Sequence, residues 1–412
     1  MNVYPGWRIA AASAGLSFLQ AALLTHAFGA YVAVLGAEHG WSKTALAGGA
    51  AIQSLEGAVL GPLLGWMVDR IGARKMVQAG VVLLSAGFVF LGSIETIAGF
   101  YMAMVLVAVG NSLSGYFPLS VAIMHWFEKR RARALAVMSG GLAFGGFAVP
   151  IVGAAMQAYG SRPVAYASAV IVLVLGWPLA CMVRNSPAEM GLAPDGEEVR
   201  ARPQPNAQAP ATAAAQAPQR AGLTARDALR TRAFWLLGLG HGFALLVVSS
   251  VNVHAITHMK EGLGYSIAQA SFVISVMTAS QFAGVVLGGM IGDRWDKRYM
   301  AAACMVAHMT GMLMLTYAVD FLMLAVFAVL HGLAWGLRGP LMQAIRGDYF
   351  GLREIGMIMG LSAIIIALGQ IVGPVLAGAL ADATGNYRLG FTILALTAGS
   401  GSLLFILAKK PG

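Results

Sequence analysis

Long apolar runs, separated by short polar segments, make up most of this chain. Twelve runs reach roughly the 20 residues that a helix needs to cross a hydrocarbon layer. Their approximate spans are 9–36, 45–67, 76–93, 98–126, 134–158, 164–183, 234–257, 267–291, 299–318, 321–345, 355–381 and 388–408. The pattern predicts an all-α integral membrane protein with twelve transmembrane helices.

One long polar stretch, residues 184–232, separates the sixth run from the seventh. Its core, ARPQPNAQAPATAAAQAPQRAG, is rich in Ala, Pro and Gln and has too little apolar surface to form a core of its own. We therefore expect a flexible linker between two six-helix bundles, which occupy residues 1–183 and 233–412.

The composition agrees with a membrane protein. Hydrophobic residues make up 58% of the chain and charged residues 11%, whereas a soluble domain carries about 25% charged residues. The net charge of +10 arises from short basic clusters between the apolar runs. Such clusters suit an anionic membrane surface, and we expect no nucleic-acid partner.

The basic residues lie mainly on one side of the predicted membrane. If the N-terminus is inside, the outer loops hold only Lys43, Arg162, Lys260 and Arg388. The inner loops hold nearly all the others, including Arg8, Arg70, Arg184, Arg346 and Lys409. The positive-inside rule then predicts cytoplasmic N- and C-termini in a bacterial inner membrane.

Motifs for covalent or metal chemistry are missing from the sequence. Cys181 and Cys304 lie in separate apolar runs, which excludes a disulfide framework and a thiolate metal site. There is no Walker loop, no metal-ligand spacing and no nucleophile motif. We expect neither an enzyme, nor a cofactor, nor an ATP-driven pump.

A short motif occurs at matching positions in the two halves, directly after the second run of each. Both copies place a glycine four residues before an Asp-Arg pair, and a further arginine five residues after the aspartate. The first copy contains Gly65, Asp69, Arg70, Gly72 and Arg74, and the second contains Asp293, Arg294 and Arg298. The glycine permits close helix approach, and the carboxylate can cap a neighbouring helix or pair with arginine. We interpret the motif as a gate; the alternative is a generic basic loop.

These features together resemble the major facilitator superfamily: twelve spans, two halves, a long central loop and the doubled motif. Within it, the first half resembles the monocarboxylate and oxalate/formate transporter branch, through GWR at 6–8, GWSK at 40–43, WFEKRRARA at 126–134 and PAEMGLAPDG at 187–196. The resemblance implies two pseudo-symmetric six-helix bundles around a central pathway. The eighth span departs from that branch, because it has no arginine before the motif.

Ionisable residues inside a membrane are costly and therefore suggest function. Arg338 lies about seven residues from the inner end of the predicted tenth span, and it shares a helix face with His331 and Trp335. The resemblance implies that this span lines the pathway, where a guanidinium could bind a carboxylate through two hydrogen bonds. Alternatively, the side chain could snorkel to the inner headgroups.

Glu56 lies at the middle of the second span. A carboxyl group there could take up and release a proton during transport, or it could stay protonated in a helix contact. Tyr116 matches a tyrosine that lines the substrate site in the resembling branch, although it could simply pack between helices. Further candidates for the pathway, which could equally be interhelical hydrogen-bonding residues, are His26, Asn252 and Gln281.

The sequence thus predicts a monomeric secondary active transporter of a small organic anion, with a carboxylate favoured and protons as the coupling ion. One alternative keeps the fold but carries a neutral or larger solute, such as a vitamin or a drug, in either direction. A second alternative is a membrane sensor that does not transport. A sensor should have gained a soluble signalling domain, whereas the linker and tails are short and simple.

Overall fold

The computed structural model describes residues 4–41, 43–196, 222–265 and 267–411, and some side chains within residues 29–58, 149–150 and 267–271 are also outside the description. The described chain is helical apart from its connections and one isolated β-bridge. Ten helical segments are long and apolar enough to span a membrane, and a bent pair, Arg131–Ala148 with Ile151–Tyr159, makes an eleventh. Helix α3 (Lys43–Ile71) supplies a twelfth rod. The prediction of an all-α membrane protein is confirmed.

Each predicted run corresponds to one helical rod, which is either a single helix or two helices that follow each other end to end. The first half contains α1 (Pro5–Gln20) continued by α2 (Phe28–His39), α3, α4 (Ala73–Gly92), α5 (Ile97–Ser114) continued by α6 (Tyr116–Trp126), α7 (Arg131–Gly145) continued by α8 (Val149–Tyr159), and α9 (Ser161–Ile171) continued by α10 (Trp177–Met182). The second half contains α12 (Arg232–Thr257), α13 (Ile267–Ile291), α14 (Lys297–Thr316), α15 (Phe321–Phe350), α16 (Ile355–Thr384) and α17 (Arg388–Leu407).

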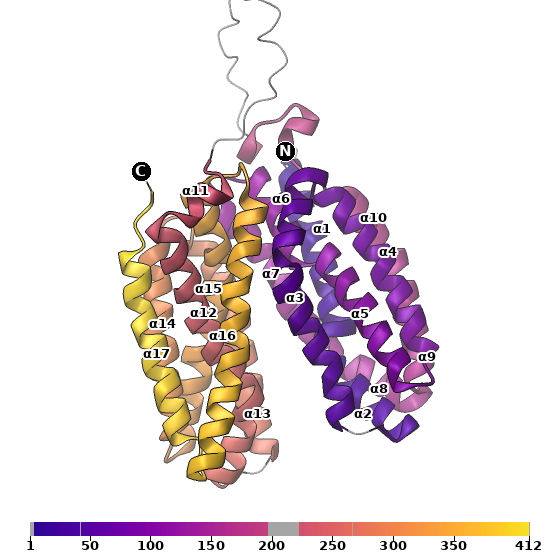
Figure 1. Cartoon of the computed structure of the whole chain (residues 1–412), viewed down its shortest axis with the longest axis vertical. Coiled ribbons are helices and arrows are strands. Elements are labelled where there is room, and N and C mark those ends of the chain that lie inside the picture. Colours follow the sequence, from indigo (N-terminus) through magenta and orange to yellow (C-terminus); the bar gives the residue numbers. More distant parts are fainter. Residues whose placement is uncertain (1–3, 42, 197–221, 266, 412) are drawn as a thin grey trace, which may run out of the picture.

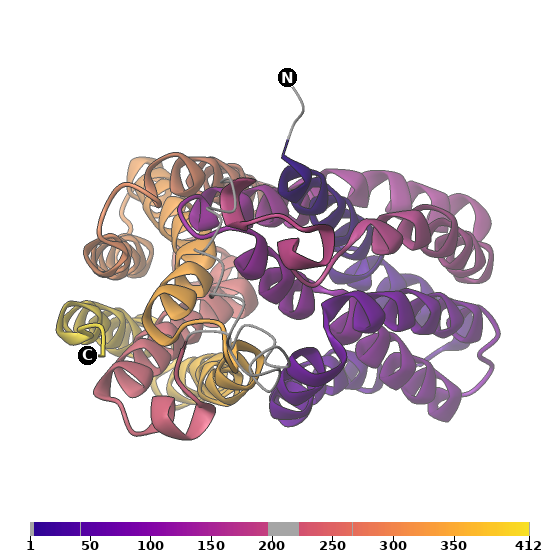
Figure 2. The same cartoon turned by 90° about the horizontal axis from the view of Figure 1, so that it is seen from above.

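The helices of the two halves form two bundles that stand side by side (Figure 1). The two ends of the chain, marked N and C, and the described flanks of the linker lie at one end of the molecule, which we call the terminal end; the opposite end is the distal end. The bundles meet towards the terminal end and diverge towards the distal end. Figure 2 shows them from the terminal end, with α1–α10 on one side and α12–α17 on the other.

Glycines allow the two bundles to touch. A Cβ atom at Gly65 of α3 would collide with the backbone of Gly356 in α16, and one at Gly360 would collide with the backbone of Gly61. On the other side of the interface, Gly289 of α13 lies against α7. Small residues at a crossing let helix backbones approach closely, so these positions determine how tightly the terminal end closes.

Both flanks of the predicted linker are attached to the bundles. On the first bundle, the Asp195 carboxylate accepts backbone hydrogen bonds from Glu128 and Lys129, at 2.9 and 2.7 Å. On the second bundle, the Leu223 amide donates to the Phe350 carbonyl, at 2.8 Å. The Ala/Pro/Gln-rich core lies outside the described residues, except for Gly222. Its flexibility stays a prediction.

Candidate functional site

The two motif aspartates connect the bundles in a reciprocal way. The Asp69 carboxylate, near the end of α3, accepts from the amides of Gly356 and Met357 at the start of α16, at 3.1 and 2.9 Å. The Asp293 carboxylate, just after α13, accepts from the amides of Ala132 and Arg133 at the start of α7, at 2.7 and 3.0 Å. In each case the second span of one bundle caps the fifth span of the other.

The capping geometry has a clear electrostatic basis. A carboxylate stabilises the partial positive charge and the unpaired amides of a helix N-terminus. Burial is the largest influence on Asp293 and raises its pKa, while the amides of Ala132 and Arg133 and the charges of Lys297 and Arg133 oppose that rise. Helix capping, one of the two contacts expected for the motif, is thus present at both aspartates.

The other motif residues shape the turns next to these caps. Gly72 has a φ of 87°, and a Cβ atom there would collide with the Asn185 side chain. The same Asn185 accepts from the Arg74 amide, at 2.9 Å. Arg298 binds the Asp296 carboxylate, at 2.7 Å, whereas Arg70 and Arg294 are exposed.

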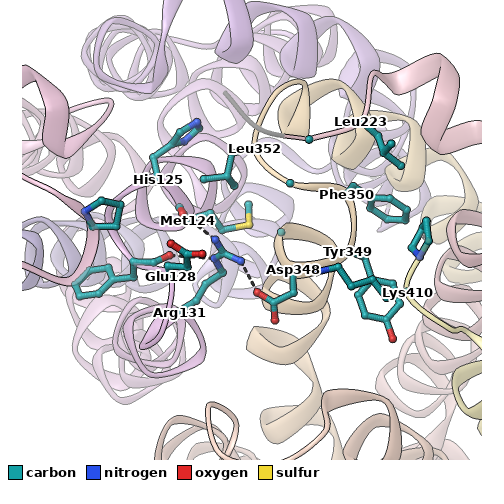
Figure 3. A pocket seen from close by; sticks show the side chains of 16 residues that line it. Met124, His125, Glu128, Arg131, Leu223, Asp348, Tyr349, Phe350, Leu352 and Lys410 are labelled. Atoms are coloured by element: carbon teal, nitrogen blue, oxygen red, sulfur yellow. Dashed lines mark hydrogen bonds and ion pairs between the residues drawn. The ribbon is translucent and has the colours of Figure 1, made fainter. Parts of the chain in front are cut away.

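An ion-pair cluster crosses the bundle interface at the same end. Arg131 of α7 pairs with Asp348 of α15, and the Lys297 ammonium lies 2.9 Å from the same carboxylate. Arg131 and Asp348 border a cavity of about 810 Å³, which Figure 3 shows from close by. Arg131 points across the interface towards Asp348 in this view. The cavity is also lined by the attached linker residue Leu223 and by Lys410 of the C-terminal tail.

Arg338 is buried deep in the second bundle. Helix α15 ends at Phe350, so Arg338 lies twelve residues, or about 18 Å, from that helix end. Its side chain is 1% exposed, and its Nε and Nη1 atoms have no hydrogen-bond partner among the described residues. The guanidinium is therefore enclosed by protein in this structure, whereas snorkelling would require it to reach the molecular surface.

The prediction that Arg346 lies in an inner loop is wrong. Helix α15 continues past the predicted end at residue 345, and Arg346 is 2% exposed within it. Its Nη1 donates to the Met342 carbonyl at 3.0 Å, and its Nη2 lies 3.1 Å from Nδ1 of His241 on α12. The only signal in the sequence was the absence of a glycine or proline between Pro340 and Gly347.

His331, which the sequence placed on the same face as Arg338, points towards α14. Its Nδ1 lies 3.1 Å from Nδ1 of His308, and both rings are fully buried. One Nδ1 must donate and the other accept, so the two imidazoles differ in protonation at this atom. Their Nε2 atoms have no partner among the described residues. This pair lies inside the second bundle, close to the charge of Arg338.

The remaining candidates are spread over both bundles. The Tyr116 hydroxyl lies 3.2 Å from the Ser139 hydroxyl of α7, and Trp335 is half-buried on α15. His26 and Asn252 are exposed, and Gln281 is half-buried. Glu56 belongs to α3, but its side chain lies outside the described residues. Arg338 and His331 therefore lie close together in the second bundle. Among the described residues, no hydrogen bond links His26, Asn252 or Gln281 to this cluster.

Two facing helical bundles, joined at one end by reciprocal helix caps, define the chain as a multi-pass membrane transporter. The family model of the Major Facilitator Superfamily matches residues 13–254 and 237–412. The chain belongs to this superfamily, and its membership of a non-enzymatic transporter family is thereby established.

Known relatives refine the comparison. Monocarboxylate transporter 4 of Gallus gallus is 24% identical over 384 residues, which cover 90% of this chain and 77% of that protein. Monocarboxylate transporter 13 of Rattus norvegicus is 25% identical over 362 residues, which cover 86% and 77%. The solved structure of the human organic anion transporter MFSD10 has a TM-score of 0.72 at 14% identity, with 97% of this chain and 99% of that chain covered.

Proposed function

We propose that this protein is a secondary active transporter that moves a small organic anion, most simply a carboxylate, across the bacterial inner membrane. The observation that carries the proposal is the Arg338 guanidinium, which is buried and lacks a partner for two of its nitrogens among the described residues. A buried charge is costly without a counter-charge. No described acid pairs with Arg338, so an anionic substrate can supply that counter-charge.

The terminal end supplies the gate. Asp69 and Asp293 hold the two bundles together there, and the positive-inside rule predicts that this end is cytoplasmic. Opening it requires both caps to release, which would expose the pathway to the cytoplasm while the distal end closes. This exchange is the alternating access expected of two bundles that move about a site near the membrane centre.

The relatives support the substrate class. Two of them are named monocarboxylate transporters, and a protein of the same fold is described as an organic anion transporter. Another solved structure of this fold is a proton:xylose symporter, with a TM-score of 0.72, 15% identity, and 98% of this chain and 96% of that chain covered. Proton symport is the coupling that we propose, with Glu56 as the acid that controls net uptake.

Substrate recognition in this proposal centres on Arg338. Trp335 adds an apolar wall, and Tyr116 adds a hydroxyl group. His331, which contacts His308, helps to position Arg338. Among the described residues, the exposed His26 and Asn252 and the half-buried Gln281 are proposed to line the route to the site. The motif residues Gly65, Asp69 and Asp293 act in gating and do not touch the substrate.

Uptake by the purified full-length protein in proteoliposomes tests this function. Labelled carboxylates of increasing length would be compared with neutral solutes of similar size. We expect saturable uptake of at least one carboxylate, and competition only by other anions. Saturable uptake of a neutral solute, with no effect of carboxylates, would overturn the organic-anion proposal and favour the alternative with a neutral substrate.

A further inference from the structure

The proposed anion site at Arg338 does not by itself assign a role to a second buried pair, His241 of α12 and Arg346 of α15. Nη2 of Arg346 lies 3.1 Å from Nδ1 of His241. A guanidinium has only hydrogen-bond donors, so Nδ1 of His241 must be the acceptor. The imidazole in this structure is therefore neutral, with its hydrogen on Nε2.

The pair lies where the second bundle faces the first. The charge of Arg346 is close enough to act on Tyr116 of α6, a residue of the first bundle. The Tyr116 hydroxyl is in turn 3.2 Å from Ser139 of α7. A ligand that binds Arg346 at this interface can therefore contact both bundles, as a transported substrate must.

The charges around His241 are all positive among the described residues. Arg338 and Arg346 of α15 both act on His241. Beside Arg338, α14 contributes the uncharged Cys304 and the His308 ring. The helices α16 and α17 bring the apolar Ile365 and Phe405 against the α12 glycines that flank His241. A protonated His241 would therefore need an anion beside it.

We propose that Arg346 shares the substrate carboxylate that Arg338 attracts, and that one proton binds to His241 together with it, which deepens the proposed function and rests on it. The carboxylate accepts Nη2–H of Arg346 in place of His241. The freed Nδ1 of His241 then forms an N–H bond with a proton from solvent, while Nε2 keeps its hydrogen. One N–H···N hydrogen bond is lost, and the new positive charge is balanced by the carboxylate.

This exchange makes anion affinity depend on pH. Imidazole is the side chain that takes up a proton between about pH 5 and 8. If one proton accompanies each carboxylate, the dissociation constant rises about tenfold per pH unit wherever the free protein binds no proton at His241. During one transport cycle, the same proton can occupy His241 and Glu56 in turn. The Kd reports only the protonation of His241, because Glu56→Gln is expected to leave substrate binding unchanged.

The test measures the Kd of labelled short-chain monocarboxylates and dicarboxylates for the purified full-length protein, between about pH 5 and 8. In His241→Asn, the amide oxygen takes the place of Nδ1 as acceptor for Arg346 but cannot be protonated in this range. We expect the wild-type slope to disappear in this variant. The matched control is His258→Gln, because His258 is a buried histidine of the same rod whose Nε2 lies 3.1 Å from the Leu315 carbonyl.

Each outcome decides the inference. A flat Kd profile in His241→Asn, with the wild-type slope retained in His258→Gln, supports it. The wild-type slope retained in His241→Asn, or a wild-type Kd that does not change with pH, overturns it while anion transport stands. If no carboxylate binds to the wild type, the proposed function fails, and the inference fails with it. Thermal unfolding checks that each variant folds; if His241→Asn does not, His241→Gln carries the same expectation.

Discussion

At the residue scale, the proposed function depends on positive charges that the chain buries without a described acid beside them. Arg338 and Arg346 are 1% and 2% exposed, and no described carboxylate pairs with either. A buried charge without a counter-charge costs stability. The burial of two guanidinium groups in a membrane protein is therefore better explained by binding than by stability.

The first prediction separates charge from shape at Arg338. Arg338→Lys keeps the positive charge but loses the planar fork, so we expect weaker substrate binding. Arg338→Gln should nearly abolish uptake, because losing one partner of a desolvated charge pair costs about 2–5 kcal/mol, or a factor of roughly 30 or more. Substrate affinity and initial uptake rate in proteoliposomes measure both effects.

The matched control for this prediction is Arg388→Gln, since Arg388 is an exposed arginine at the start of α17. It should transport like the wild type. Unchanged affinity and rate in Arg338→Gln would mean that Arg338 does not bind substrate, and the organic-anion proposal would lose its main support.

Arg338 could be predicted from the sequence, whereas Arg346 could not. Arg338 interrupts an apolar run, and a charge there stands out in any reading of the pattern. Arg346 comes where the apolar run gives way to Arg, Gly and Asp, which is also the composition of an inner loop. The helix continues because tertiary contacts bury it, with His241 binding the guanidinium. A contact with a residue 105 positions away leaves no local signal.

At the scale of elements, the helix caps and glycine crossings explain how the terminal end is held closed. The doubled motif was visible in the sequence because its spacing is local. The identity of the capped helices was not, because Asp69 meets residues 287 and 288 positions away. Only the packing of α3 against α16 brings them together.

The second prediction concerns Asp69→Asn. The amide keeps the shape but loses the charge that stabilises the start of α16, an effect of about 0.3–1 kcal/mol at an exposed helix end and up to about 2 kcal/mol when partly buried. We expect turnover to slow much more than substrate binding weakens, because Asp69 stabilises one state of the gate. Comparing the maximal uptake rate with the binding constant tests this.

Asp382→Asn is the control, because Asp382 is an exposed carboxylate near the distal end of α16. It should leave both quantities unchanged. Normal turnover together with tenfold weaker binding in Asp69→Asn would contradict the gating role.

The third prediction uses the glycine crossing. In Gly65→Ala, the added Cβ meets the backbone of Gly356 and Met357, which cannot move without separating α3 from α16. Overpacking typically costs about 1–3 kcal/mol, and here that cost falls on the closed terminal end alone. We expect the terminal end to open more often and transport to slow, as measured by the labelling rate of a single cysteine introduced on α16 near Gly356.

Gly140→Ala is the matched control, because a Cβ atom at Gly140 of α7 would have no neighbour within 4 Å. Its labelling rate and transport should match those of the wild type. Equal labelling in Gly65→Ala and the wild type would show that this crossing does not limit opening.

At the scale of the whole molecule, one linker connects the two bundles, and hydrogen bonds attach each of its flanks to a bundle. Twelve rods, their order and the division into halves could be predicted from the sequence, because each depends on the length and hydrophobicity of a local run. The attachment of the linker flanks could not, because Asp195 caps a loop that begins more than 60 residues earlier. The conformation at the terminal end likewise depends on long-range contacts.

The fourth prediction concerns the orientation of the molecule. The segment around 207–217 should be cut by protease in inverted vesicles, because the distribution of basic residues predicts a cytoplasmic terminal end. In right-side-out vesicles it should be protected. Cleavage from the outer face of intact right-side-out vesicles would reverse the predicted topology.

The most direct test of the central claim is whether a proton gradient drives accumulation of a carboxylate by the purified protein in proteoliposomes. We predict that an inward proton gradient raises the internal carboxylate concentration above the external one, and that a protonophore abolishes this accumulation. Glu56→Gln should still exchange internal for external carboxylate but should not accumulate it. Carboxylate that only equilibrates across the membrane whatever the proton gradient, or that does not enter at all, would contradict the account.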